Sequence, residues 1–169
     1  MDLTPYQPWI IFIHVAASFA FIAAHGASMA VFFRLRTERD RVKLTTLLEL
    51  SSYSFGALYI AFLILLVAGI LAGIVGGWWT NGGLWLWTAL VVLVVVVGLM
   101  YGLMTTNYGQ VRQALGIPSQ NDQKKGIVPE PASDEALDAL LTSSRPTIGA
   151  VVGLAGLLVI IWLMVVKPF

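Results

Sequence analysis

Residues 84–106 read LWLWTALVVLVVVVGLMYGLMTT, a stretch without a single charged side chain. In water, the valine run at 94–97 would favour a β-strand. A bilayer is crossed instead by roughly 20 consecutive apolar residues in a helix, because lipid offers no partner for unpaired backbone amides. The length of the stretch and its lack of charge therefore predict a membrane-spanning α-helix.

Three further segments have the same character. They cover about residues 9–33, 55–76 and 147–166, and every Lys, Arg, Asp and Glu lies outside the four segments. The whole chain of 169 residues is 58% apolar and 11% charged, whereas soluble domains carry about 25% charged residues. We therefore expect an all-α membrane protein, with residues 1–169 forming one domain built as a four-transmembrane-helix bundle.

The overall charge and the cysteine content exclude several classes of protein. A formal net charge of +1 offers no basic surface for phosphates, so the sequence argues against nucleic-acid binding. The absence of cysteine excludes disulfides, thiolate metal sites and cysteine nucleophiles. No catalytic group of polar side chains is identifiable in the spans, so the sequence does not decide whether the protein is an enzyme.

The distribution of basic residues predicts an orientation. Nine of the ten Lys and Arg residues fall between the first two spans or in the loop 107–146 between the last two. Such loops stay in the cytoplasm under the positive-inside rule, which places both termini outside (N-out/C-out). All six tryptophans lie near the opposite interface, which indole prefers; they are Trp9, Trp78, Trp79, Trp85, Trp87 and Trp162.

The chain has two histidines, and both lie in the first span. His14 and His25 are 11 residues apart, which corresponds to about 16.5 Å of helix rise and to the same helix face. Ser18, Phe21, Ser28 and Met29 continue this face. An ionisable side chain within a span indicates a functional site, although a neutral imidazole that hydrogen-bonds between helices is the ordinary alternative.

The spacing of the two histidines limits what they can bind. At about 16.5 Å they cannot share one metal ion or one haem, so each would be an axial ligand of a separate b-type haem in an electron-transfer protein. Because the sequence has no third histidine, the opposite axial position requires a homodimer, a partner membrane subunit, a methionine or an open site. The candidate methionines are Met29, Met100 and Met104.

Two supporting tyrosines and an alternative metal complete the candidate site. We expect Tyr59 and Tyr101 to reach the depth of His25 and to hydrogen-bond with it. Copper is the alternative to haem, because thioether sulfur and imidazole nitrogen are ligands that copper accepts. In that case His25 would act together with Met29, Met100 and Met104.

Glycines spaced by four residues predict close helix packing. They are Gly69, Gly73 and Gly77 in the second span, Gly98 and Gly102 in the third, and Gly149 and Gly153 in the fourth. Small residues at this spacing let helix backbones approach each other in lipid. These glycines pack the four helices of one chain together, or they contact a second copy or a different subunit. The last possibility suggests a non-catalytic accessory subunit of a larger membrane complex.

The segments outside the spans also carry predictions. We expect residues 42–54 to extend the second helix and residues 107–115 to extend the third. Gly116–Ser133 has the composition of a flexible linker. Ser133 is a candidate N-cap for an amphipathic helix over Asp134–Thr142, with Leu137, Leu140 and Leu141 on the membrane surface. The alternative is a solvated loop with one helical turn.

The run Phe12-Ile13-His14-Val15-Ala16-Ala17 resembles the opening of a group of membrane proteins. The group contains copper-resistance protein D-like proteins and haem-binding membrane protoporphyrinogen oxidases. The closest likeness is to a bacterial four-span integral membrane family allied to them. Residues 25–28, 34–40, 47–51 and 164–168 also resemble that family.

The resemblance implies a b-type haem on His14 and a place in the bacterial cytoplasmic membrane. The chain departs from the oxidases at Phe21, where they carry a tryptophan, and it lacks their intramembrane lysine. His25 lies outside the oxidase pattern and depends on its spacing from His14 alone.

Overall fold

The computed structural model describes residues 3–169, and every regular element in them is helical. Four helices are long and apolar enough to cross a membrane, as the sequence predicts. They are α1 (Gln7–Thr37), α2 (Arg41–Val75), α4 (Trp85–Met100) with its continuation, and α8 (Arg145–Val166). The protein is therefore an all-α, multi-pass membrane protein.

The third span continues beyond α4 into the loop region. One π-helical turn, η2 (Tyr101–Thr105), joins α4 to α5 (Thr106–Ala114) without a break in the helix. The second span likewise begins well outside the apolar segment, at Arg41, where the Asp40 carboxylate accepts hydrogen bonds from the amides of Val42 and Lys43. Both predicted helix extensions are confirmed.

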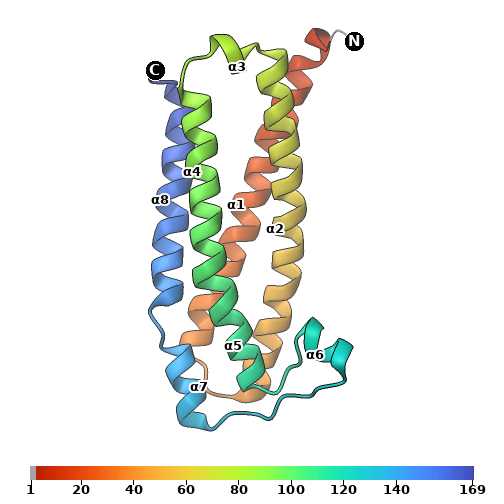
Figure 1. Ribbon diagram of the computed structural model, residues 1–169, viewed down its shortest axis with the longest axis vertical. Helices are drawn as coiled ribbons and strands as arrows, with labels where there is room; N and C mark the ends of the chain where they lie inside the picture. The colour runs from red at the N-terminus through yellow and green to blue at the C-terminus, as the bar shows by residue number, and fades with distance from the viewer. Residues whose placement is uncertain (1–2) are drawn as a thin grey trace.

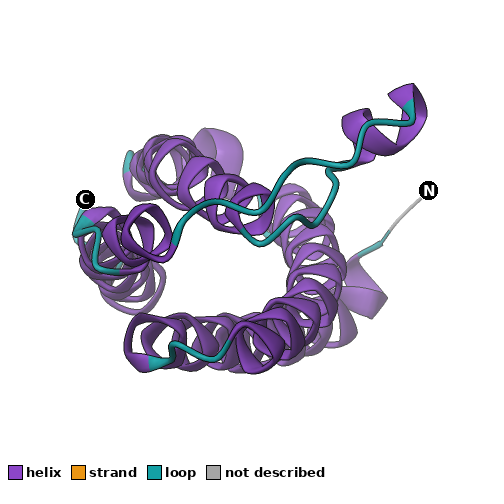
Figure 2. Cartoon of the chain, turned by 90° about the horizontal axis from the view of Figure 1, so that it is seen from below, coloured by secondary structure: helices purple, strands orange, loops and turns teal. Residues whose placement is uncertain are grey.

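The four long helices stand side by side and form a ring when seen along the bundle axis (Figures 1 and 2). The most extensive helix–helix contacts lie between α1 and α2 and between α4 and α8. Much of the outer surface is apolar and uncovered; Val91 and Val94 of α4, for example, are 63% and 70% exposed. Only lipid or another chain can cover such a surface, which agrees with a membrane location.

Both termini and the short helix α3 (Trp78–Asn81) lie at one end of the bundle, which we call the terminal end (Figure 1). Gly77 allows the turn into α3 because its φ of 65° lies in the left-handed region that favours glycine. The backbone amide of Trp85 donates to the carbonyl of Phe169 at 3.2 Å. The Lys167 ammonium lies 4.5 Å from the Trp78 ring centroid, so the carboxyl end of the chain is held against α3 and α4.

The opposite end, which we call the basic end, holds the α1–α2 connection and residues 107–146 (Figure 1). Helix α7 (Asp134–Leu141) begins where predicted, with the Ser133 hydroxyl accepting from the Ala136 amide. Its Leu137 and Leu141 are each only 4% exposed, and they pack in a core with Leu44 and Leu48 of α2. The expectation that α7 lies on the membrane surface is therefore wrong, because its apolar side is buried against the protein.

Ion pairs fix α7 to the α1–α2 connection. Arg41 pairs with Asp134 and Arg39 pairs with Asp138, each at 2.6 Å. The preceding segment also differs from its expected form. Within the stretch that composition marks as a flexible linker, α6 (Gln120–Lys125) forms behind a capping box made by Ser119 and Asp122. The hydroxyl and the carboxylate of this pair each accept from a backbone amide, which is how a short helix begins.

Candidate functional site

The first candidate residue, His14, is half-buried on α1 against α2. Its Nδ1 lies 3.0 Å from the carbonyl oxygen of Leu65. A carbonyl oxygen can only accept a hydrogen bond, so Nδ1 carries the proton and Nε2 of the neutral ring keeps its lone pair. No group in residues 3–169 forms a hydrogen bond with Nε2. The helix pair thus fixes both the tautomer and the orientation of this imidazole.

Gly69 of α2 makes the room for the His14 ring. A Cβ at this position would lie 2.8 Å from His14 Cε1 and 3.0 Å from Nδ1, closer than atoms tolerate. On α1, the Ser18 hydroxyl donates to the His14 carbonyl oxygen at 2.8 Å, so Ser18 satisfies its own donor within the helix and leaves the ring free. The predicted packing role of Gly69 within the chain is confirmed.

The second candidate residue, His25, lies on α1 with its Nε2 close to α8. Its ring stacks on Phe21, with the centroids 5.9 Å apart and the planes at 7°. Its Nε2 lies 3.3 Å from the position that a Cβ on Gly153 of α8 would occupy. Neither ring nitrogen has a hydrogen-bond partner among the described residues 3–169.

A glycine ridge on α8 forms the surface that His25 meets. Gly149, Gly153 and Gly156 each face a side chain of the third span, in order Met104, Met100 and Val96. A Cβ on Gly153 would lie 2.8 Å from Met100 Sδ, so both the Met100 side chain and the His25 ring pack against this glycine. Met100 is the last residue of α4, and the π-helical turn η2 starts directly after it.

The structure keeps the two histidines apart, as their spacing predicts. His14 contacts the backbone of α2, whereas His25 lies against Gly153 of α8. Of the supporting candidates, Tyr59 and Tyr101 are 62% and 71% exposed. Neither hydrogen-bonds with His25 in the described part of the chain, so the expected support from these tyrosines is wrong. Met29 is half-buried one turn beyond His25.

A polar cluster at the basic end is absent from the sequence-based prediction. Arg36 of α1 donates to the Thr147 hydroxyl and to the Thr142 carbonyl oxygen. Near it, Asn107 is 1% exposed, and its Oδ1 has no partner among residues 3–169. Both side chains line a cavity of about 10 Å³, which is enough for one water molecule. A lone Asn just beyond a span could have signalled this cluster.

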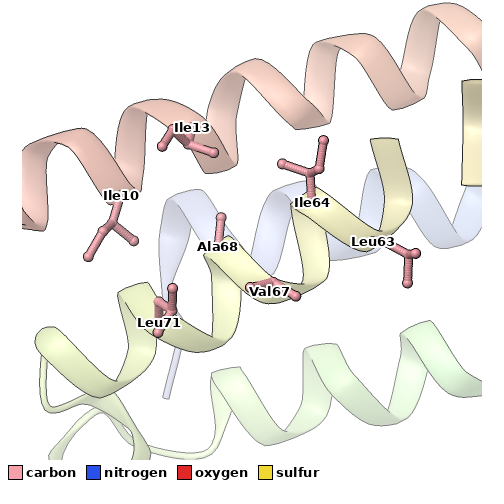
Figure 3. Close-up of a pocket in the computed structure, with 7 residues that line it drawn as sticks. All are labelled: Ile10, Ile13, Leu63, Ile64, Val67, Ala68 and Leu71. Carbon is pink, nitrogen blue, oxygen red and sulfur yellow. The ribbon is translucent and has the colours of Figure 1, made fainter. Parts of the chain in front are cut away.

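A cavity of about 380 Å³ forms a groove between α1 and α2, and its lining is wholly apolar (Figure 3). It is lined by Ile10, Ile13, Leu63, Ile64, Val67, Ala68 and Leu71. At 100° per residue, Ile64 and Val67 lie on the flank of α2 opposite Gly69. The groove therefore opens on the lipid side of the pair and contains neither histidine.

In residues 3–169, no three His, Asp or Glu side chains converge as a metal-binding group. One imidazole nitrogen and one thioether sulfur, those of His25 and Met100, lie within 3.3 Å of the Cβ position of Gly153. No family model, no curated protein and no solved structure matches the chain.

Proposed function

We propose that this protein is a membrane redox protein that binds b-type haem through His14. The observation that carries the proposal is the hydrogen bond from His14 Nδ1 to the Leu65 carbonyl oxygen, at 3.0 Å. Histidines that bind a metal centre usually donate their other ring N–H to a carbonyl or carboxylate group, which fixes the tautomer and makes the ligand nitrogen more basic. His14 has this arrangement.

The surroundings of His14 suit an iron ligand within a membrane. The Leu65 carbonyl accepts a hydrogen bond from Nδ1, Gly69 leaves room for the Nδ1–Cε1 edge of the ring against α2, and Nε2 has no hydrogen-bond partner among residues 3–169. A bound haem would supply one-electron redox chemistry. The protein would hold its iron, exclude water, and set its potential through the basicity of His14.

The test is the absorption spectrum of the full-length protein, purified in mild detergent from cells grown with a haem precursor. We expect a Soret band that disappears in His14→Ala and persists in His25→Ala, the matched control on the same helix. A colourless wild-type preparation would refute the proposal, and so would a Soret band that survives His14→Ala. Bis-imidazole ligation would in addition require a second chain, because His25 is about 16.5 Å away.

We further propose that the basic end faces the cytoplasm of a bacterium and that both termini face out. The support is the concentration of Lys and Arg at the basic end and of tryptophan at the terminal end. Because the chain has no cysteine, single cysteines at Asn81 and Lys125 can be labelled in intact cells with an impermeant maleimide. We expect label at position 81 only; label at position 125 alone would reverse the orientation.

A second candidate function, an accessory subunit of a membrane complex, has one observation in its favour. Beyond its own helix, a Cβ at Gly98 or Gly102 of the third span would meet no atom of residues 3–169 within 4 Å, whereas a Cβ at Gly73 would meet Trp79. The Gly98–Gly102 ridge is therefore free for a helix of another chain. Gly98→Leu should release a bound partner or a second copy in mild detergent, and Gly56→Leu, which is equally open, should not. A wild-type monomer without partners would exclude this function.

A further inference from the structure

The chain between α5 and α7 makes an excursion that stands outside the ring of long helices, at about the level of α7 (Figures 1 and 2). Its middle is α6, and at the end of α6 the sequence reads KKGIV over residues 124–128, which we call the α6 tip. The tip combines two cations with two aliphatic side chains. We propose that the α6 tip binds the surface of a membrane that contains anionic phospholipid.

The excursion is closed at its base, which gives the tip a defined place on the molecule. The Ala132 amide donates to the Ala114 carbonyl oxygen at 2.9 Å. Beside this bond Gly116 has a φ of 76°, and a Cβ there would lie 3.1 Å from Pro131 Cγ. The two ends of the excursion are therefore held together at the basic end, while its middle overhangs the space around the bundle (Figure 2). In a membrane protein that space is lipid and the water at its surface.

The way in which α6 ends exposes the aliphatic pair. Gly126 has a φ of 67° and ends the helix, and the Ile127 amide donates back to the Asp122 carbonyl oxygen at 2.9 Å. At a helix end of this type, the apolar residue after the glycine often packs on the residue that accepts this bond. Here that residue is charged and offers no apolar contact. Ile127 is accordingly 50% exposed and Val128 is 75% exposed.

The two lysines of the tip are also exposed, and neither forms an ion pair in residues 3–169. Cations of the α1–α2 connection differ in this respect. Arg39 and Arg41 pair with Asp138 and Asp134 of α7, so their charges are already matched within the protein. The charges of the tip are available to the phosphates of lipid headgroups.

Of the two acidic residues near the tip, one opposes this attraction. The Asp122 carboxylate accepts a hydrogen bond from the Ser119 amide at 2.9 Å and belongs to the start of α6. Glu130 is exposed beyond the aliphatic pair, so Glu130→Gln should strengthen binding. Each lysine near an anionic leaflet favours binding by about fivefold. The spans already hold the tip at the membrane, so two lysines are enough for docking.

The composition of the tip favours a lipid surface over a protein partner. Lysine attracts anionic headgroups, and aliphatic side chains enter the boundary between headgroups and acyl chains. Protein interfaces are instead enriched in aromatic residues and arginine and depleted in lysine. Residues 116–131 contain two lysines but no aromatic residue and no arginine.

The experiment attaches a nitroxide to the full-length protein through Gln123→Cys, an exposed position in a chain without other cysteines. The protein is placed in nanodiscs of phosphatidylcholine, with or without about one third phosphatidylglycerol. Collision of the nitroxide with an aqueous nickel complex measures its exposure. We expect the collision rate to fall about threefold or more with phosphatidylglycerol. It should recover in about 1 M salt, where the Debye length is only about 3 Å.

The role of the lysines is tested in the same labelled protein. Lys124→Gln together with Lys125→Gln should abolish the effect of phosphatidylglycerol. The matched control, Arg34→Gln together with Lys43→Gln, removes two cations that are paired with Glu38 and Asp40 at the basic end, and it should keep the effect.

Three results would overturn the proposal: equal collision rates in the two lipid mixtures, an effect that survives the loss of both tip lysines, or an effect that both double variants lose equally. Shielding of the nitroxide that appears only in native membranes would assign the tip to a protein partner instead. None of these measurements depends on haem, so the proposal stands or falls separately from that for His14.

Discussion

Gly69 lies against the Nδ1–Cε1 edge of the His14 imidazole, so close that a Cβ at Gly69 would come within 2.8 Å of the ring. The hydrogen bond from His14 to the Leu65 carbonyl depends on this contact, because Leu65 is four residues earlier on the same helix as Gly69. The glycine therefore has a specific role: it lets an imidazole pack against the backbone of a neighbouring helix within the membrane.

Gly69→Ala should displace the His14 ring and lower the free energy of unfolding by about 1–3 kcal/mol, as overpacking does. Gly56→Ala on the same helix meets no atom within 4 Å, so it should stabilise the helix by about 0.5–1 kcal/mol. Unfolding by sodium dodecyl sulfate, followed by circular dichroism, measures both changes. Equal stabilisation by the two variants would show that His14 does not pack on Gly69.

Leu137→Ala in α7 should destabilise the protein by about 2–5 kcal/mol, the usual cost of removing a fully buried leucine side chain. Val128→Ala, in a nearby loop where the valine is 75% exposed, should change stability by less than about 0.5 kcal/mol. The same unfolding measurement compares the two. If α7 lay on lipid instead, Leu137→Ala would leave the unfolding transition unchanged and weaken only the contact with membrane.

Arg36→Ala should cost about 1.5–3 kcal/mol, because it removes hydrogen bonds from a charged donor to Thr147 and to the Thr142 carbonyl. These bonds join the end of α1 to the start of α8 and to the residue that caps α7. Arg34→Ala removes only an exposed ion pair with Glu38 and should cost less than about 1 kcal/mol. Similar losses of stability in both variants would contradict the role given to Arg36.

Lys167→Met should loosen the terminal end, because it removes a cation from the Trp78 and Trp85 rings, 4.5 and 5.3 Å away. The expected cost is about 0.5–2 kcal/mol, accompanied by a change in tryptophan fluorescence. Lys167→Arg keeps the charge and should preserve both properties. A fluorescence change of equal size in both variants would point to packing of the side chain instead of its charge.

Acid should loosen the α1–α2 connection through Glu38. Hydrogen bonds from the amides of Asp40 and Arg39 lower the pKa of the Glu38 carboxyl. Because the pKa of Glu38 is lower in the folded protein, its hydrogen bonds stabilise the fold at pH values above the pKa in the unfolded chain. That stabilisation is lost as the pH falls through the pKa in the folded protein. As the pH rises through this acid range, the Asp40 amide should therefore become better protected from hydrogen exchange. Protection is measured by comparing its exchange rate with the intrinsic rate at each pH. Glu38→Gln should abolish that gain.

The sequence predicts the four spans because charge-free segments of this length leave the backbone no other structure in lipid. It does not predict the position of α7, because the periodicity of Leu137 and Leu141 shows only that one face is apolar. Both a membrane surface and a protein core bury such a face. Helix α7 packs on the protein core because Leu44 and Leu48 lie on the part of α2 beyond the membrane segment and provide a complementary apolar surface.

For the candidate site, the sequence identifies His14 and His25 as exceptions in an apolar helix but not their surroundings. His25 and Met100 both lie near Gly153 because of how α8 packs against α4. The spacing of residues within α1 gives no information about that packing. The sequence does not predict the burial of Asn107, for a similar reason. Its burial depends on α7, which contacts it through the Leu140 carbonyl.

The π-helical turn at Tyr101–Thr105 divides the third span into two helical parts that face different neighbours. Before the turn, Val96 and Met100 face α8; after it, Asn107 and Val111 face α7 and the core of the basic end. Deleting one residue from the turn would leave a helix long enough to cross the bilayer but would rotate everything beyond it by about 100°. The membrane would accept such a shortened chain, whereas the basic end would lose the alignment of its buried face.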